Sequence, residues 1–208
     1  QSIKLRMLKY QLNPHFLFNS LNSVSALVQR GSPEEATDML ARIADLLRIS
    51  LDDDDELTHT ISEELDMIAL YLSIEKVRFK DRLQVQLSVT EDAKKVQIPS
   101  FLLQPIFENA IKYAVGKTLL PTEVNCDIRI EGHHLMICVS DTGPGLDQTE
   151  NSNKSQSTGI GLKNVEERLS AHYGDRFQLR LSENTPQGAR VELSIPVSTD
   201  ITTHDQID

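Results

Sequence analysis

Four short blocks of this sequence combine residue types and spacings that could do chemistry, and the first surrounds a histidine. Residues 13–19 read NPHFLFN, so His15 directly follows Pro14 in a stretch whose leucines recur at helical spacing. A proline inside a helix removes a backbone donor and costs about 3 kcal/mol, and such conflicts cluster at functional sites. An ordinary imidazole, with a pKa of about 6.5, offers a nucleophilic nitrogen at neutral pH. Taken alone, the block is better explained by a kinked core helix with one satisfied histidine.

The second block, residues 104–113 (QPIFENAIKY), has the spacing of one helix face. Gln104, Glu108 and Lys112 stack at intervals of four residues, with Asn109 beside them. Amide and carboxylate oxygens next to an ammonium group suit a hydrated Mg²⁺ ion and phosphates, because Mg²⁺ prefers hard oxygen ligands and keeps several waters. A surface Glu–Lys pair explains the same residues without a ligand.

The last two blocks are rich in glycine. Residues 141–145 (DTGPG) place an aspartate at the end of a strand-like segment, where it can accept a hydrogen bond from an amino group, before two glycines that permit close backbone approach. Residues 158–165 (TGIGLKNV) lead a polar loop into a Gly-x-Gly helix start, whose N–H groups and dipole favour phosphate. This pattern is neither a Rossmann fingerprint nor a P-loop. A simple Asp-x-Gly turn explains residues 141–145 without a ligand.

The elements before the acidic run at residues 52–56 form a helical hairpin in this prediction. Residues 1–30 read as a long helix kinked at Pro14, and a capped turn at 31–35 leads into a second helix that ends near Leu51. Two helices cannot bury both of their apolar stripes alone, so we expect a second copy of the chain to complete a four-helix bundle. The acidic run lacks the spacing of a calcium loop and reads as a linker.

The rest of the chain reads as helices on a mainly antiparallel sheet, an α+β fold. A capping box at Thr60 and Glu63 starts a helix that ends near Phe79. We also expect a mobile polar loop at 147–158 and a frayed tail at 197–208. The remaining helices are predicted at 99–115 and 159–173, and the strands at 83–89, 124–130, 135–139, 177–181 and 191–195.

Composition narrows the function classes. The 208 residues are 39% hydrophobic and 25% charged, as in ordinary globular proteins, and carry a net charge of −10. An acidic chain is a poor candidate for binding nucleic acid or an anionic membrane surface, so a phosphate site must create its positive field locally. We identify no signal peptide and no apolar run of about 18 residues. The two cysteines, Cys126 and Cys138, read as a reduced, buried pair, which fits a cytosolic setting.

In this order and spacing, the three later blocks resemble the N, G1 and G2 boxes of the Bergerat-fold (GHKL) ATP-binding domain. With the NPHFLFN box ahead of them, the chain is similar, over about residues 5–197, to bacterial sensor histidine kinases of the LytS/YehU/AlgZ type. The resemblance implies a dimeric phosphoacceptor hairpin in residues 1–56, a Bergerat-fold α/β sandwich in residues 57–198 and a disordered tail in residues 199–208.

The resemblance also implies roles for individual residues. His15 would be the phosphoacceptor, Asn109 the Mg²⁺ ligand and Glu108 a polar or basic partner for the chemistry. Asp141 would bind the adenine amino group, Lys112 would meet a phosphate, and the polar loop would be the ATP lid. The other positions that the resemblance places at the nucleotide are Tyr113, Gly143, Gly145, Thr158, Gly159, Ile160, Gly161, Leu162 and Gly188.

Two positions depart from the family pattern. In commoner histidine kinases an acidic residue follows the phosphoacceptor and serves as the base, whereas Phe16 follows His15 here. Three explanations stay open: Glu108 is the base, Asn19 one turn along orients the ring, or no strong base is needed. Ala189 also stands where the family often has threonine, which would weaken the hydrogen bonding near the nucleotide.

The implied reaction is autophosphorylation of His15 with ATP and Mg²⁺, followed by transfer to an aspartate of a response-regulator receiver domain. In this family the regulator often carries a LytTR-type DNA-binding domain. The protein would be a homodimer without direct contact to nucleic acid, and the cytoplasmic portion of an inner-membrane protein with an upstream sensor region. Two alternatives stay open: a GHKL ATPase without phosphohistidine, and a non-catalytic dimeric module that docks a regulator.

Overall fold

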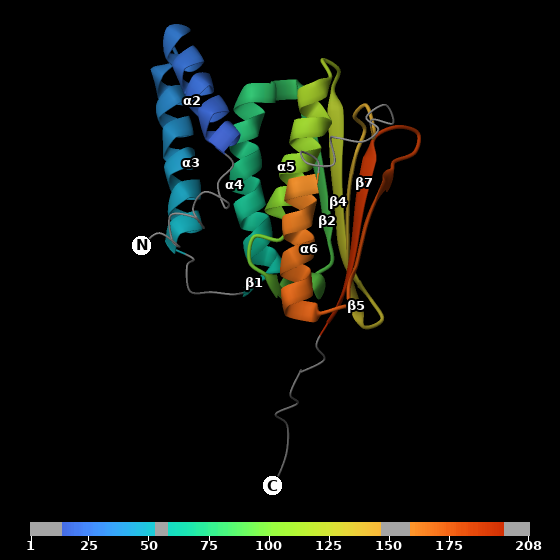
Figure 1. The fold of residues 1–208 in the computed structure, drawn as a ribbon. Coiled ribbons are helices and arrows are strands. Elements are labelled where there is room, and N and C mark those ends of the chain that lie inside the picture. The colour runs from blue at the N-terminus through green and yellow to red at the C-terminus, as the bar shows by residue number, and fades with distance from the viewer. Residues whose placement is uncertain (1–13, 53–57, 147–158, 198–208) are drawn as a thin grey trace.

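The molecule has a helical hairpin on one side, a sheet on the other and three helices between them (Figure 1). The computed structural model describes residues 14–52, 58–146 and 159–197. Among these residues, no helix combines the length and the apolar character that crossing a membrane requires. Residues 53–56 of the predicted linker, the polar loop at 147–158 and residues 198–208 of the predicted tail lie outside the described residues, whereas Asp52 is the last residue of a helix.

The predicted hairpin is formed by helix α2 (Pro14–Gln29) and helix α3 (Pro33–Asp52), which pack against each other. Gly31 stands between them with a φ of +77°, a conformation that glycine adopts without strain and that suits the end of a helix. The described part of the first helix begins at Pro14. The predicted kink depends on residues before it, which lie outside the described residues.

Helix α4 (Ile61–Phe79) connects the hairpin to the rest of the molecule. It begins with the predicted capping box, in which Glu63 N–H donates to Thr60 Oγ1 at 3.2 Å and Thr60 N–H donates to the Glu63 carboxylate at 2.7 Å. Near its middle, Tyr71 packs against Phe16 of α2 with ring centroids 5.1 Å apart. Both rings are buried, so the start of α2 is attached to α4 by an aromatic contact.

The sheet has five strands in the order β2-β4-β5-β7-β6. Strands β2 and β4 pair in parallel and the other three pairs are antiparallel, which confirms the predicted α+β fold with a mainly antiparallel sheet. Helices α5 (Gln104–Tyr113) and α6 (Gly159–Tyr173) lie on one face of it, and α5 contacts both α4 and α6 (Figure 1). The strands are β2 (Leu83–Val89), β4 (Thr122–Glu131), β5 (His134–Asp141), β6 (Gln178–Glu183) and β7 (Ala189–Pro196).

The prediction that a helix starts at Pro99 is wrong. Pro99 ends a short strand, β3 (Gln97–Pro99), which pairs with β1 (Thr58–Thr60) in a separate two-stranded sheet. Residues 100–103 then form a turn in which Phe101 has a φ of +57°. Because a left-handed backbone cannot continue a right-handed helix, α5 begins only at Gln104.

The two cysteines lie on the neighbouring strands β4 and β5, and both are free thiols. Cys126 is buried, whereas Cys138 is only half-buried, so the predicted burial holds fully for one of them. Burial raises the pKa of Cys126 to about 12. A thiol of this kind stays protonated and unreactive at neutral pH.

Candidate functional site

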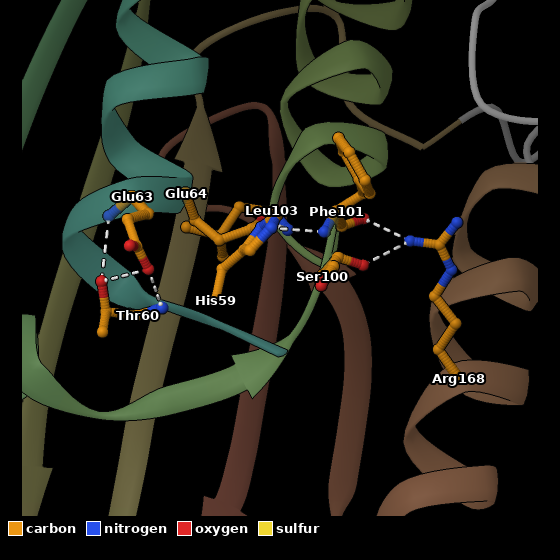
Figure 2. A network of polar contacts seen from close by, with 8 residues as sticks. All are labelled: His59, Thr60, Glu63, Glu64, Ser100, Phe101, Leu103 and Arg168. Atoms are coloured by element: carbon orange, nitrogen blue, oxygen red, sulfur yellow. Dashed lines mark hydrogen bonds and ion pairs between the residues drawn. The ribbon is translucent and has the colours of Figure 1, made fainter. Parts of the chain in front are cut away.

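The turn that precedes α5 is held from both sides, by a buried carboxylate and by a half-buried guanidinium group (Figure 2). Glu64 of α4 accepts hydrogen bonds from the backbone N–H of Phe101 and, at 2.9 Å, of Leu103. On the other side, Arg168 of α6 donates to the carbonyl oxygens of Ser100 at 2.6 Å and Phe101 at 3.0 Å. These bonds satisfy backbone groups that the strained turn leaves unpaired, and they fix where α5 starts relative to both neighbouring helices.

One face of α5 carries the predicted row of polar side chains. Gln104 Nε2 donates to Glu108 Oε1 at 3.0 Å, and Lys112 follows one turn later with its ammonium group 4.8 Å from the centroid of the Tyr113 ring. Glu108 is half-buried and Lys112 is exposed. The structure therefore confirms the predicted i, i+4 arrangement and places an acceptor and a cation on one helix face.

The neighbouring face of α5 meets the start of α6. A Cβ on Gly161 would lie 3.1 Å from Asn109 Nδ2 and 3.2 Å from Asn109 Oδ1, which is tighter than ordinary contact, so glycine lets the amide approach the first turn of α6. Asn109 Nδ2 is buried and has no hydrogen-bond partner among the described residues. Buried amide groups are normally paired, so this amide is available for a ligand at the N-terminus of a helix.

The aspartate at the end of β5 is fixed by backbone donors. Asp141 Oδ1 accepts from Gly143 N–H at 2.9 Å and from Ala189 N–H at 3.2 Å. Burial raises the pKa of Asp141, and these two hydrogen bonds oppose the rise. The contact with Ala189 uses only its backbone, so the absence of a threonine side chain at this position leaves this bond intact.

Two glycines are required by the packing around this aspartate. A Cβ on Gly188 would lie 1.8 Å from the Asp141 carbonyl oxygen, and Gly188 has a φ of +114°. A Cβ on Gly143 would lie 2.4 Å from the Cβ of Ala114, at the end of α5. Residues 141–145, the start of β7 and the end of α5 therefore meet at one corner of the domain.

The remaining predicted nucleotide residues are only partly described. Gly145 has a φ of +89° and its backbone faces that of Gly188. Gly159 and Ile160 form the first helical residues of α6, and Leu162 is half-buried on it. Thr158 and the predicted ATP lid lie outside the described residues.

A cleft of about 270 Å³ brings the predicted phosphoacceptor to α5. His15 and Asn19 of α2 line it together with Glu108 and Lys112 of α5, although more than 80 residues separate the two pairs in the sequence. His15 is exposed, and Asn19 Nδ2 lies 3.0 Å from His15 Nδ1. The cleft is at the small end of ligand pockets, which are typically about 300–1,000 Å³, so it suits a phosphoryl group better than a whole nucleotide.

Glu75, a residue that sequence reasoning missed, belongs to the same cleft. It lies on α4 with only 4% of its side chain exposed, and Arg78 Nη1 is 3.6 Å from its Oε2. Burial raises the pKa of Glu75 to about 7; Arg78 opposes the rise and Glu108 adds to it. The available signal was an acidic residue at a position where Ile68, Leu72 and Phe79 of the same helix are buried.

These contacts define a class of protein: helices on a mainly antiparallel sheet, with a glycine-rich corner beside α5, whose other side borders a cleft lined by a histidine from a helical hairpin. Comparison with protein families agrees with this class. The family model described as histidine kinase matches residues 3–83. The model described as histidine kinase-, DNA gyrase B- and HSP90-like ATPase matches residues 94–199. The chain therefore belongs to the histidine kinase family, and its C-terminal half is an ATP-binding domain.

Individual relatives support the predicted resemblance to the LytS type. The sensor histidine kinase BtsS of Escherichia coli (strain K12) is 34% identical over 193 residues, which are 93% of this chain and 33% of BtsS. The sensor protein LytS of Staphylococcus haemolyticus is 32% identical over 203 residues, which are 94% of this chain and 34% of LytS. This chain thus spans about one third of the length of the curated relatives that it matches.

A solved structure shows the same fold. The histidine kinase domain of the blue-light activated histidine kinase EL346 from Erythrobacter litoralis superposes with a TM-score of 0.52 at 14% identity. The superposition covers 89% of this chain and 97% of that domain. At this identity the likeness concerns the fold alone.

Proposed function

We propose that this chain is the catalytic core of a two-component sensor histidine kinase that uses ATP to phosphorylate His15. The observation that carries the proposal is the cleft in which His15 of α2 lies opposite Glu108 and Lys112 of α5. In this proposal, residues 1–56 are the phosphoacceptor module and residues 57–198 are the ATP-binding domain.

The nucleotide would bind between the G1 turn and the start of α6. Asp141, whose carboxylate is fixed by two backbone donors, would accept a hydrogen bond from the adenine amino group. Gly159 and Gly161 would let the phosphates approach the N-terminus of α6, where backbone N–H groups and the helix dipole favour anions. Lys112 would add a positive charge beside them.

Asn109 fits the role of a Mg²⁺ ligand. An amide oxygen is a hard donor of the kind that Mg²⁺ accepts, and the Asn109 amide makes no hydrogen bond through Nδ2 to any described residue. The described residues contain no group of three or more His, Cys, Asp or Glu side chains that could hold a metal alone. Phosphate oxygens and waters would therefore complete the ligand set, and the bound ion would neutralise phosphate charge.

The transfer would occur at the His15 ring. A ring nitrogen forms a bond to the γ-phosphorus while the bond from that phosphorus to the bridging oxygen breaks, and the electron pair stays on ADP. Such transfers depend mainly on positioning and charge neutralisation. Asn19, which lies 3.0 Å from His15 Nδ1, would hold the ring, and Lys112 and Lys117 in the same cleft would balance the charge.

The partners are a second copy of the chain and a response regulator. On α2, Phe18, Leu21 and Val28 are exposed on one side of the helix, which supports a homodimer that buries them in a four-helix bundle. The phosphoryl group would pass to an aspartate of a receiver domain, which we expect to belong to a LytTR-type regulator. The relatives are about three times longer and are named sensors, so we expect an upstream membrane sensor region and a cytoplasmic location for this portion.

Incubation with γ-labelled ATP tests the proposal. We expect label on the protein that is lost in acid, is stable in base and is absent from the His15→Ala variant. ATP turnover without such label would instead indicate an ATPase that makes no phosphohistidine. ATP binding by the wild-type chain that is as weak as that of the Asp141→Asn variant would indicate a docking module.

A further inference from the structure

The cleft beside His15 contains a buried carboxyl group that the proposed reaction has not used. Glu75 projects from α4 into the cleft that His15 and Asn19 line from α2. Its Oε2 is buried and has no hydrogen-bond partner among the described residues, because Arg78 at 3.6 Å is beyond hydrogen-bond distance. An unsatisfied buried carboxylate oxygen costs stability, which calls for a functional explanation.

The groups around Glu75 come from four elements. Arg78 and Tyr71 belong to its own helix and His15 to α2, while Glu108 and Lys112 belong to α5 and Lys117 to the short helix η3 (Val115–Lys117) that follows it. Arg78, Lys112 and Lys117 are cations, so the cleft can hold both a carboxylate and an incoming phosphoryl group. Tyr71 is buried against Phe16, and burial raises its pKa well above the ordinary value, so it remains neutral.

We propose that Glu75 accepts the imidazole proton of His15 during phosphoryl transfer, an assignment that rests on the proposed function. As one ring nitrogen bonds to phosphorus and ADP leaves with the electron pair of the broken P–O bond, the other ring nitrogen becomes acidic. Its proton moves to the Glu75 carboxylate, so the phosphohistidine ring ends neutral and Glu75 ends as a carboxylic acid. Solvent then removes that proton.

The position after His15 explains why an acid from another helix is needed. Phe16 is 5% exposed and packs against Tyr71, so this position attaches α2 to α4 and offers no proton acceptor. Tyr71 and Glu75 are four residues apart on α4 and therefore lie on the same side of that helix. The aromatic contact thus brings His15 to the part of α4 that carries Glu75. The pKa of about 7 is near the pH at which a general base works best.

A single-turnover assay with γ-labelled ATP and the whole chain tests the assignment. Glu75→Gln keeps the shape of the side chain and removes the base, so we expect labelling to slow by about a hundredfold or more, while the affinity for a fluorescent ATP analogue stays unchanged. The acid side of the pH–rate profile should lose one ionisation. Asp66→Asn is the matched control, because Asp66 is an exposed acid on the same helix, and it should label at the wild-type rate.

Chemical rescue separates a base from a structural role. In Glu75→Ala the space left in the cleft should admit formate, which should restore part of the labelling rate, whereas Glu75→Gln should not respond. Wild-type-like labelling by Glu75→Gln, with an unchanged pH profile, would overturn the assignment of Glu75 alone. A wild-type chain that binds ATP and takes up no label would overturn the proposed function as well.

Discussion

The substitution Glu64→Gln tests how the structure fixes the start of α5. The Glu64 side chain is 1% exposed and accepts three hydrogen bonds: from the backbone N–H groups of Phe101 and Leu103, and from His59, whose Nδ1 lies 3.0 Å away (Figure 2). Glutamine has nearly the same shape but only one acceptor oxygen. The substitution therefore leaves the packing intact and removes part of the hydrogen bonding of the turn.

The expected loss of stability follows from those bonds. In Glu64→Gln the amide nitrogen faces one of the backbone donors, and a buried donor without an acceptor costs about 1–3 kcal/mol. The bonds that remain lose the assistance of a charged acceptor, which is worth roughly another 1 kcal/mol. We therefore expect the free energy of unfolding to fall by about 2–4 kcal/mol.

Urea-induced unfolding, followed by far-ultraviolet circular dichroism, measures this difference. Asp66→Asn on the exposed side of the same helix is the control and should stay within about 0.5 kcal/mol of the wild type. A Glu64→Gln variant within the same range would refute the conclusion that Glu64 holds the turn before α5.

Three further substitutions have outcomes that follow from the structure. Gly188→Ala would place a Cβ 1.8 Å from the Asp141 carbonyl oxygen, so we expect a loss of at least about 3 kcal/mol in thermal denaturation; a near-normal melting temperature would contradict this. Gly161→Ala would press on the Asn109 amide, so calorimetry should show ATP binding about tenfold weaker, equivalent to about 1.4 kcal/mol, with little change in melting temperature; unchanged affinity would argue against Asn109 at the nucleotide. Glu75 has a pKa of about 7 in the folded chain and of about 4.5 in the unfolded chain, so wild-type stability is lost as pH rises between these values. The Glu75→Gln variant should be as stable as the wild type below this range and more stable by up to about 3 kcal/mol above pH 7. No gain in stability above pH 7 would show that Glu75 is not buried as described.

The parts of the fold that the sequence predicted depend on local chemistry. Thr60 and Glu63 are three residues apart, and the hydrogen bonds of a capping box form within that distance. The alternation of residue types in β4 and β5 matches an alternation of buried and mostly half-buried positions along each strand. Asp141 was predicted at a strand end because a turn with two glycines follows it, and β5 ends there.

The parts that the sequence did not predict depend on contacts between distant elements. Nothing near Pro99 indicates that a strand will pair with Thr58–Thr60, and Glu64 binds backbone groups 37 and 39 residues further along the chain. Glu75 reads as a member of an ordinary amphipathic helix until α2 and α5 are placed against α4. For Glu64 and Glu75, an acidic residue at a buried helix position was the local sign, but its partners could be identified only in the folded chain.

The most direct measurement concerns the cleft that His15 shares with α5 of its own chain. Heterodimers are prepared from one chain with His15→Ala and a differently tagged partner with Asn109→Ala, and both are incubated with γ-labelled ATP. Because His15 lies in a cleft with α5 of the same chain, the helix to which we assign ATP binding, we predict that these heterodimers take up no label, while wild-type chains paired with His15→Ala chains do. Label on His15 of the Asn109→Ala chain would contradict transfer within one chain and with it the role assigned to this cleft.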